Sequence, residues 1–430
     1  MLSHLSEAYH QPKNHWDTAK KILTVAIGTM VEYYDYALYG FFSSILASLF
    51  FPTDTPSLAL LKTFGIFLTG SLSKPFGAVI FGYIGDRFGR AIALKISMIG
   101  MIIPTMLMGS LPTYQQLGWI SPCLLLLCRI FQGIFTSGAS DGMRIFIYES
   151  IGHQRPCLAA SLSGIACMLG ISCASFAASM VTYFSAYPNA WRMPFLFGGI
   201  LGILVFYTRH HIRETPNFKA YLTVSPTETS LSLLTVLSKH KRIFLSSILL
   251  CGAVGGLYHF YMIFLGHYLS HTLAIIDSHT LSSYITKGLF TYTISGLVAG
   301  VFADRFGPMR ILRYSLTGLL IILPFNALMI SHNQFNICAF LITTLLLSFF
   351  STPGFVILLE NLHIGVRYRC ISIGHSLGSM LFSGSAPIIS LWLWHITHHP
   401  IAPFIYCFLL IIMGFLAIFL LKYPRIKNHG

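Results

Sequence analysis

The chain has 430 residues, of which 55% are hydrophobic and only 9% are charged, and its formal net charge is +14. Soluble domains carry roughly 25% charged residues, so this composition excludes an ordinary soluble protein. An excess of positive charge can indicate a nucleic-acid partner, but here the basic residues are dispersed along the chain, which argues against one.

Long apolar runs follow one another from the N-terminal to the C-terminal region. A transmembrane helix needs about 20 apolar residues, and the sequence predicts twelve such helices. In chain order, their expected spans are 21–50, 58–84, 91–111, 120–148, 157–184, 191–209, 242–269, 280–302, 309–331, 335–359, 369–395 and 401–422. We therefore predict an all-α polytopic membrane protein with two six-helix halves.

Basic residues gather in every second connection between these spans. If the N-terminus is cytoplasmic, the two tails and the even-to-odd connections hold 21 of the 27 Lys and Arg residues. The opposite connections hold Arg192. Because Lys and Arg are enriched in cytoplasmic loops, both termini are predicted to be cytoplasmic. The expected location is the bacterial inner membrane, with membrane lipid as a partner.

A polar stretch near the middle separates the two predicted halves. The predicted segments are a cytoplasmic tail over 1–20, a first half over 21–209, a cytoplasmic linker over 210–241, a second half over 242–422 and a tail over 423–430. The first 20 residues are polar and the first apolar run is too long for the core of a cleavable signal peptide. None of the loops is long enough to hold a soluble domain.

A charged turn occurs once in each predicted half. The frame G-x-x-x-D-R-F-G begins at Gly82 and returns 218 positions later at Gly300. Related features in the same order indicate two halves related by an axis along the membrane normal. Asp86 is expected near the start of the next helix, where negative charge is favourable, and Arg87 is expected to bridge to Glu149 on another helix.

These residues are candidates for a cytoplasmic gate that closes and opens during transport. The alternative role, an anchor for the topology, is compatible with gating. The second copy has Pro308 and Met309 where the first has Arg90 and Ala91, so the first turn is the stronger gate candidate. The predicted gating residues are Gly82, Asp86, Arg87, Arg90, Glu149, Asp304 and Arg305.

Ionisable residues within the predicted spans are few, and they indicate function because charge inside a bilayer is costly. Glu32 and Asp35 are three positions apart and share one face of the first helix. Two nearby carboxylates raise each other's proton affinity, so we predict both as proton-coupling residues, with Asp35 as the better candidate. The alternative is a structural contact to a tyrosine or to Lys74.

Basic and aromatic side chains in the spans are candidates for solute binding. Arg129 remains charged when buried and can hold an anionic group, although bonding to helix ends is the alternative. Asp141 and Arg144 are three apart, so they are either a structural pair or solute contacts. Tyrosine ring faces can contact a cationic solute. The predicted solute-binding residues are Arg129, Asp141, Arg144, Lys74, Tyr36 and Tyr258.

The sequence offers little support for an enzyme or a cofactor protein. Its nine cysteines form no C-x-x-C pair and mostly fall inside predicted helices, where they read as small packing residues. We see no nucleophile–base spacing and no metal-ligand cluster. The expected partners are a small organic solute and a proton, with no cofactor, no metal, no nucleic acid and no evident obligate protein partner.

Several of these motifs resemble the major facilitator superfamily. The turn G-x-x-x-D-R-x-G-R at Gly82 and the string R-x-x-Q-G at Arg129 are similar to two superfamily motifs. Residues 28–36, 191–195 and 213–218 resemble the metabolite:proton symporter group, which includes proline/betaine, citrate and α-ketoglutarate carriers. The resemblance implies twelve helices, a central cavity between the halves, and solute uptake driven by a proton gradient. It also assigns coupling or binding to Glu32, Asp35 and Arg129.

The chain departs from that group on three helices, and on the first of them Tyr33 stands where tryptophan is common. Lys74-Pro75 stands where the group often has Arg-Pro, and Ala139 stands at a usual glutamate position, with Asp141 two residues later. The solute is therefore left open, with positive charge favouring an anion or zwitterion. The leading hypothesis is a proton-coupled importer of a small polar organic solute that works by alternating access. The alternatives are an exporter or siderophore-type carrier of the same fold, and a non-transporting receptor or scaffold.

Overall fold

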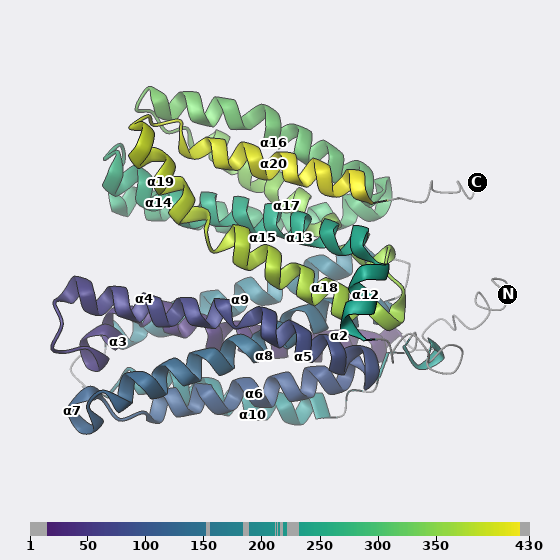
Figure 1. Cartoon of the computed structure of the whole chain (residues 1–430), viewed down its shortest axis with the longest axis horizontal. Helices are drawn as coiled ribbons and strands as arrows, with labels where there is room; N and C mark the ends of the chain where they lie inside the picture. Colours follow the sequence, from purple (N-terminus) through teal and green to yellow (C-terminus); the bar gives the residue numbers. More distant parts are fainter. Residues whose placement is uncertain are drawn as a thin grey trace. The chain divides into compact units, whose positions relative to one another are not determined.

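A computed structural model describes residues 15–151, 155–183, 189–210, 212, 214–215, 218–221 and 232–421 (Figure 1). Every regular element within these ranges is a helix. Most of the predicted N-terminal tail, a part of the predicted linker that includes 222–231, and the predicted C-terminal tail lie outside the described residues. The all-α prediction is confirmed for the part of the chain that is described.

The first predicted half contains nine helices among its described residues. They are α2 (His15–Phe41), α3 (Ser43–Phe50), α4 (Pro56–Leu72), α5 (Lys74–Arg87), α6 (Arg90–Ser110), α7 (Tyr114–Leu117), α8 (Ile120–Ile151), α9 (Pro156–Tyr183) and α10 (Arg192–His210). The predicted second span is divided between α4 and α5 because Pro75 begins a new helix at its first turn. Gly89, with a φ of 117°, makes the tight connection from α5 to α6.

The second predicted half has the same helical character but contains three π-helical segments. Helix α12 (Leu233–Lys239) falls in the predicted linker and precedes this half. The elements of the half are α13 (Lys241–His259), η2 (Phe260–Phe264), α14 (Leu265–His267), η3 (Tyr268–Thr272), α15 (Ser278–Phe306), α16 (Pro308–Ser331), α17 (Ile337–Glu360), α18 (Ile364–Gly378), η4 (Ser379–Ser383), α19 (Ala386–Thr397) and α20 (Pro403–Leu420). π-helical turns inside α-helices frequently mark functional positions.

Eleven helical stretches of the described chain are long and apolar enough to cross a membrane. They match the second to twelfth predicted spans. The predicted first span, which α2 and α3 occupy, is not among them, because α2 carries Glu32, Asp35 and four tyrosines, which lower its mean hydropathy. The count of twelve and the cytoplasmic location of both termini stay predictions.

The chain forms two compact units. Unit 1 contains Met1–Ile151, Leu162–Ser230 and Ile364–Ser372, and unit 2 contains Gly152–Ser161, Leu231–His363 and Ile373–Gly430. The start of α9 therefore belongs to unit 2, although the rest of this helix belongs to unit 1. The start of α18 belongs to unit 1, although the rest of that helix belongs to unit 2. The predicted domain boundaries stay predictions, and the units are described separately below.

An aromatic core in unit 1 positions α2 against α10. Phe42 and Trp191 both pack edge-on against Phe195, with ring centroids 5.5 and 6.2 Å apart. The Tyr34 hydroxyl donates to the carbonyl oxygen of Pro194 at 3.1 Å. Gly198 lies against Tyr34 and Asp35 so closely that a methyl group there would collide with the Asp35 carboxylate. The acidic face of α2 is consequently held beside α10.

Candidate solute and proton site

Glu32 forms a buried ion pair with an arginine that lies 177 positions away. Arg209, on α10, donates from Nη1 to Glu32 Oε1 at 2.7 Å and from Nη2 to the carbonyl oxygen of Val25 at 2.9 Å. Both charged side chains are fully buried. Gly28 leaves the room that the guanidinium occupies, since any side chain there would overlap it. Sequence reasoning missed Arg209 because this residue ends the predicted span 191–209 and was counted with the basic residues of the cytoplasmic connection that follows.

Removing one partner of this pair is expected to destabilise unit 1 strongly. The change Arg209→Met leaves the Glu32 carboxylate buried without its cation, which typically costs about 3–5 kcal/mol of unfolding free energy. Adding Glu32→Gln removes the isolated charge and should recover most of the lost unfolding free energy.

Unfolding of the detergent-purified protein measures both variants. Lys62→Met, which removes an exposed ion pair to Asp54, serves as the control because such pairs contribute about 1 kcal/mol or less. Equal destabilisation of the single and double variants would contradict this account.

Asp35 is buried like Glu32 but has no arginine beside it. The residue is 1% exposed, and Oδ1 has no hydrogen-bond partner among the described residues. Its neighbouring polar side chain is Thr105 on α6, whose hydroxyl donates to the Met101 carbonyl oxygen at 2.9 Å. An ionised carboxylate in such a position is expensive unless it is paired, so Asp35 is suited to carry a proton. Glu32 and Asp35, which were predicted together, therefore differ in their surroundings, since Glu32 is paired with Arg209 and Asp35 is not paired with an arginine.

Arg129 lies in a cage of aromatic rings from α2 and α4. Its guanidinium carbon is 4.7 Å from the ring centroid of Tyr36, 4.5 Å from that of Tyr39 and 4.9 Å from that of Phe67. Nη1 donates to Gln132 Oε1 at 2.7 Å and to the carbonyl oxygen of Tyr36 at 3.3 Å. Nε and Nη2 are buried and have no partner within the described part of the chain.

Lys74 and Tyr36 extend this site toward α5. The Lys74 ammonium lies 4.6 Å from the Tyr36 ring centroid, and the Tyr36 hydroxyl is 3.1 Å from Ser71 Oγ. One tyrosine ring therefore contacts the two cations Lys74 and Arg129. Three of the six predicted solute-binding residues come together here, on α2, α5 and α8.

The other three predicted solute-binding residues lie elsewhere. Asp141 and Arg144, on α8, form an ion pair of 3.8 Å with each other. Tyr258 belongs to unit 2, where its ring centroid is 5.3 Å from that of Tyr292. The Tyr292 hydroxyl in turn donates to Ser351 Oγ at 2.9 Å.

The Asp86 carboxylate in unit 1 binds the start of α18. The backbone N–H groups of Tyr368 and Arg369 both donate to it at 3.1 Å, and Arg369 Nε donates to Oδ2 at 3.0 Å. Gly82 allows this approach, because a methyl group there would lie 2.9 Å from the Arg369 Cα. The expected role of Asp86, favouring the start of the next helix along the chain, is thus corrected, since the carboxylate serves a distant helix.

Glu149 is contacted by Arg90 and not by Arg87. Arg90 Nε lies 3.2 Å from Glu149 Oε2, and Arg367 Nη1 donates to Oε1 at 2.9 Å. Arg87 is on the exposed side of α5 and rests on the rings of Tyr83 and Phe88. The predicted bridge from Arg87 to Glu149 is therefore wrong, because Arg90, one turn further on, is the arginine that faces inward.

Three described residues of the predicted linker belong to the same cluster. Glu214 Oε2 accepts from the Ala91 N–H at 3.0 Å at the start of α6. Burial raises the pKa of Glu214 above its usual value. Thr215 Oγ1 donates to Glu149 Oε2 at 2.9 Å, and the Phe218 ring lies 4.3 Å from the Arg90 guanidinium. Glu214, Thr215 and Phe218 thus have a structural role that sequence reasoning did not assign.

Asp304 makes the equivalent contact inside unit 2. Its two carboxylate oxygens accept from the backbone N–H groups of Cys157 and Leu158, at the start of α9, at 2.8 and 2.9 Å. Arg305 lies against the Phe306 ring at 5.5 Å. In both copies of the repeated turn, the aspartate therefore binds two consecutive N–H groups near the start of another helix.

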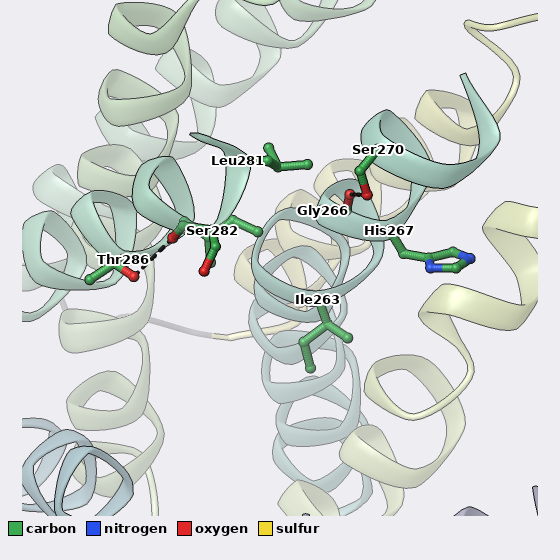
Figure 2. Close-up of a pocket in the computed structure, with 8 residues that line it drawn as sticks. Ile263, Gly266, His267, Ser270, Leu281, Ser282 and Thr286 are labelled. Carbon is green, nitrogen blue, oxygen red and sulfur yellow. Dashed lines mark hydrogen bonds between the residues drawn. The ribbon is translucent and has the colours of Figure 1, made fainter. Parts of the chain in front are cut away.

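A separate cleft of about 310 Å³ opens in unit 2 beside α14 and α15 (Figure 2). Its polar lining includes His267, Ser270, Ser282 and Thr286. Ser270 donates to the Gly266 carbonyl and Thr286 to the Ser282 carbonyl, both at 2.9 Å, so these two hydroxyls are engaged with their own helices (Figure 2). The cleft contains none of the predicted site residues. Among the described residues, no group of three or more His, Cys, Asp or Glu is placed to hold a metal ion.

Comparison with other sequences identifies relatives along almost the whole chain. A putative proline/betaine transporter of Staphylococcus aureus (strain COL) is 29% identical over an alignment of 436 positions, gaps included. The alignment covers 95% of this chain and 92% of that protein. A proline/betaine transporter of Salmonella typhimurium is 27% identical and covers 93% of this chain and 82% of its own length.

Solved structures with the same fold include two sugar carriers. The proton:xylose symporter XylE matches with a TM-score of 0.70 and 15% identity, over 94% of each chain. The Escherichia coli fucose:proton symporter FucP matches with a TM-score of 0.68 and 12% identity, over 94% of this chain and all of that one. The sequence profile of the Major Facilitator Superfamily matches residues 25–363. This multi-pass membrane protein therefore belongs to the Major Facilitator Superfamily.

Proposed function

We propose that this protein is a proton-coupled symporter that takes up a small solute carrying a carboxylate group. In this proposal, Arg129 binds the carboxylate and Asp35 carries the proton. The observation that supports it most directly is the buried Arg129 guanidinium, whose Nε and Nη2 have no partner among the described residues. A buried charge with unmet donors is costly, and an anionic ligand would relieve that cost.

The geometry of the guanidinium favours a carboxylate over other anions. Nε and Nη2 form one edge of the planar fork, and this edge matches the two oxygens of a carboxylate. Nη1 is already held by Gln132 and Tyr36, so the fork is fixed before a ligand arrives. Lys74, across the Tyr36 ring, adds positive charge to the same side of unit 1.

The names of the sequence relatives agree with this class of solute. Proline and betaine both carry a carboxylate and a positively charged nitrogen, so they are the first solutes to test. The Lys74-Pro75 string and the Asp141–Arg144 pair, where the chain departs from the symporter group, are reasons to test other carboxylates as well.

The Asp86 and Asp304 contacts fit a role in alternating access. We propose that the N–H bonds from Tyr368 and Arg369 to Asp86 form and break during each transport cycle. The Asp304 bonds to the start of α9 are proposed to act in the same way in unit 2. Gating by these residues remains part of the proposal.

Gly70, on α4, offers a precise test of the proposed carboxylate site. A methyl group at this position would lie 3.2 Å from the Arg129 carbonyl oxygen and 3.5 Å from both Nε and Nη2, so Gly70→Ala should cover the free edge of the guanidinium. We expect affinity for the carboxylate solute to fall about tenfold or more, since each 1.4 kcal/mol corresponds to about a factor of ten. Binding is measured by calorimetry on the detergent-purified protein.

Gly65 on the same helix is the matched control. A methyl group there meets no atom within 4 Å, so Gly65→Ala should leave affinity unchanged. Unaltered affinity in Gly70→Ala, together with normal binding in Gly65→Ala, would contradict the placement of the solute at Arg129.

The proposed function is tested by a ligand screen followed by transport. A ligand that binds the folded protein raises its apparent thermal stability. We expect proline, betaine or another small carboxylate to raise the unfolding temperature, and the same compound to accumulate in proteoliposomes under an imposed pH gradient. Stabilisation only by solutes without a carboxylate would contradict the assigned role of Arg129.

A further inference from the structure

Two hydrogen bonds lead from Arg129 through Gln132 to Thr105, which lies beside Asp35 within unit 1. Arg129 Nη1 donates to Gln132 Oε1 at 2.7 Å, and Gln132 Nε2 donates to Thr105 Oγ1 at 2.8 Å. The Thr105 hydroxyl donates to the Met101 carbonyl oxygen at 2.9 Å, and the Asp35 carboxyl group is its other polar neighbour. All four side chains are buried, and they come from α8, α6 and α2. The candidate solute site and the candidate proton site are therefore physically joined.

The direction of the first two bonds is fixed by chemistry. A guanidinium has donors only, so the Gln132 carbonyl oxygen must face Arg129. The Gln132 amide nitrogen must then face Thr105, which accepts from it. The Thr105 hydroxyl has a single proton and two acceptors within reach, the Met101 carbonyl oxygen at 2.9 Å and the Asp35 carboxylate. Its choice between them depends on whether Asp35 is ionised.

We infer that Gln132 and Thr105 are positioning residues that couple solute binding at Arg129 to protonation of Asp35. This inference rests on the proposed function. When Asp35 is ionised, we expect the Thr105 hydroxyl to turn from Met101 to the Asp35 carboxylate. Three bonds then donate in the same direction, and bonds arranged head to tail strengthen one another. The charge of Arg129 then stabilises the charge of Asp35 through two neutral side chains.

Binding of a carboxylate changes this balance in the direction that symport needs. The solute draws the donors of Arg129 toward itself and offsets the guanidinium charge, so the run of bonds supports the Asp35 carboxylate less. The proton affinity of Asp35 rises, and a proton is taken up with the solute. The Thr105 hydroxyl is then free to donate to Met101. By reciprocity, protonation of Asp35 strengthens solute binding by the same factor.

The other groups that face Asp35 are accounted for. Glu32 acts on it from the same helix, and its charge is offset by Arg209 on α10. Tyr34, also on α2, interacts with Asp35 but donates its hydroxyl to the Pro194 carbonyl on α10. From α6, the neighbouring group is Thr105, which accepts a hydrogen bond from Gln132 on α8, and Gln132 in turn accepts from Arg129.

The test compares four variants of the full chain in detergent and in proteoliposomes. Thr105→Val and Gln132→Met each break the run of bonds with side chains of similar size. Thr105→Ser keeps the hydroxyl. Thr63→Val is the matched control, because Thr63 is also fully buried but its hydroxyl donates only to the Ala59 carbonyl of its own helix. Proline and betaine are the probes, and affinity is measured at mildly acidic and mildly alkaline pH.

In the unmodified protein, we expect affinity to be on the order of tenfold higher at the acidic pH, a usual size for coupling between two sites. Thr105→Val and Gln132→Met should reduce this ratio to about twofold or less while still binding solute, and gradient-driven accumulation should fall in parallel. Thr105→Ser and Thr63→Val should retain the unmodified ratio.

The outcomes separate the two proposals. If the unmodified protein shows pH-dependent binding and both Thr105→Val and Gln132→Met keep it, the inferred coupling through Gln132 and Thr105 is overturned. The proposed function then stands. If the unmodified protein binds the probes with no pH dependence and no gradient-driven accumulation, the proposed function fails. Thermal unfolding of each variant identifies any that does not fold. If Thr105→Val or Gln132→Met does not fold, the inferred coupling is judged on the other of these two variants.

Discussion

Replacement of Asp35 by asparagine is expected to abolish proton-driven accumulation of solute while leaving solute binding measurable. The asparagine side chain has nearly the same size and fits beside Gly198, but it cannot gain or lose a proton at physiological pH. Without a group that changes charge, the imposed pH gradient has nothing to act on. Accumulation is measured in proteoliposomes, and binding is measured by calorimetry in detergent.

Asp54→Asn is the control for Asp35→Asn. Asp54 is an acidic residue that pairs with the exposed Lys62 at 2.8 Å, and such surface pairs contribute little. We expect this variant to accumulate solute normally. Full accumulation in Asp35→Asn would show that another group carries the proton, and Glu32 would be the next residue to change.

Replacement of Arg129 by glutamine is expected to abolish high-affinity binding, because the site loses its fixed fork of donors. Two hydrogen bonds to a charged group contribute about 1.5–3 kcal/mol each, so affinity for the carboxylate solute should fall about 100-fold or more. Calorimetry measures the loss, and the same titration with Gly65→Ala provides the reference.

The stability of the Arg129→Gln variant distinguishes a binding residue from a structural one. Two of the donors of Arg129 have no partner among the described residues, so removing the charge leaves no buried anion unpaired. We therefore expect its unfolding temperature to be equal to or above that of the unmodified protein. Arg209→Met, by contrast, should be less stable, because it strands Glu32. A large loss of stability in Arg129→Gln would contradict its assignment as a ligand-binding residue.

The positions of the membrane helices were predictable because they depend on local composition. A run of about 20 apolar residues is legible in any sequence, and the predicted spans coincide with the described helices from α4 to α20. The first span was hardest to judge by hydropathy, since α2 carries the acidic and tyrosine residues of the candidate site. These acidic and tyrosine residues lower the mean hydropathy of α2, and they are also what indicates that α2 has a functional role.

The pairing of side chains across the chain was not predictable. Glu32 and Asp35 look alike in sequence, but Arg209, far away on α10, reaches only Glu32. Arg87 and Arg90 are both near the repeated turn, and only the rotation of α5 and α6 decides that Arg90 is buried. Gln132 was visible as part of a motif, but its link to Thr105 depends on how α6 packs on α8.

The repeated turn illustrates the same limit. The shared frame at Gly82 and Gly300 correctly drew attention to Asp86 and Asp304 as equivalent residues. Each carboxylate accepts two backbone N–H groups, from α18 and from α9 respectively. The targets of these bonds carry no sequence signature, because every residue except proline has a backbone N–H group.

Solute-driven proton movement is the most direct measurement of the proposed mechanism. Proteoliposomes containing the purified protein and an internal pH indicator are given proline or betaine from outside, with no gradient imposed. We expect acidification of the lumen that requires solute, saturates with solute concentration, and disappears in Asp35→Asn. Solute entry without any change in internal pH, in vesicles shown to hold a pH gradient, would contradict proton-coupled symport by this protein.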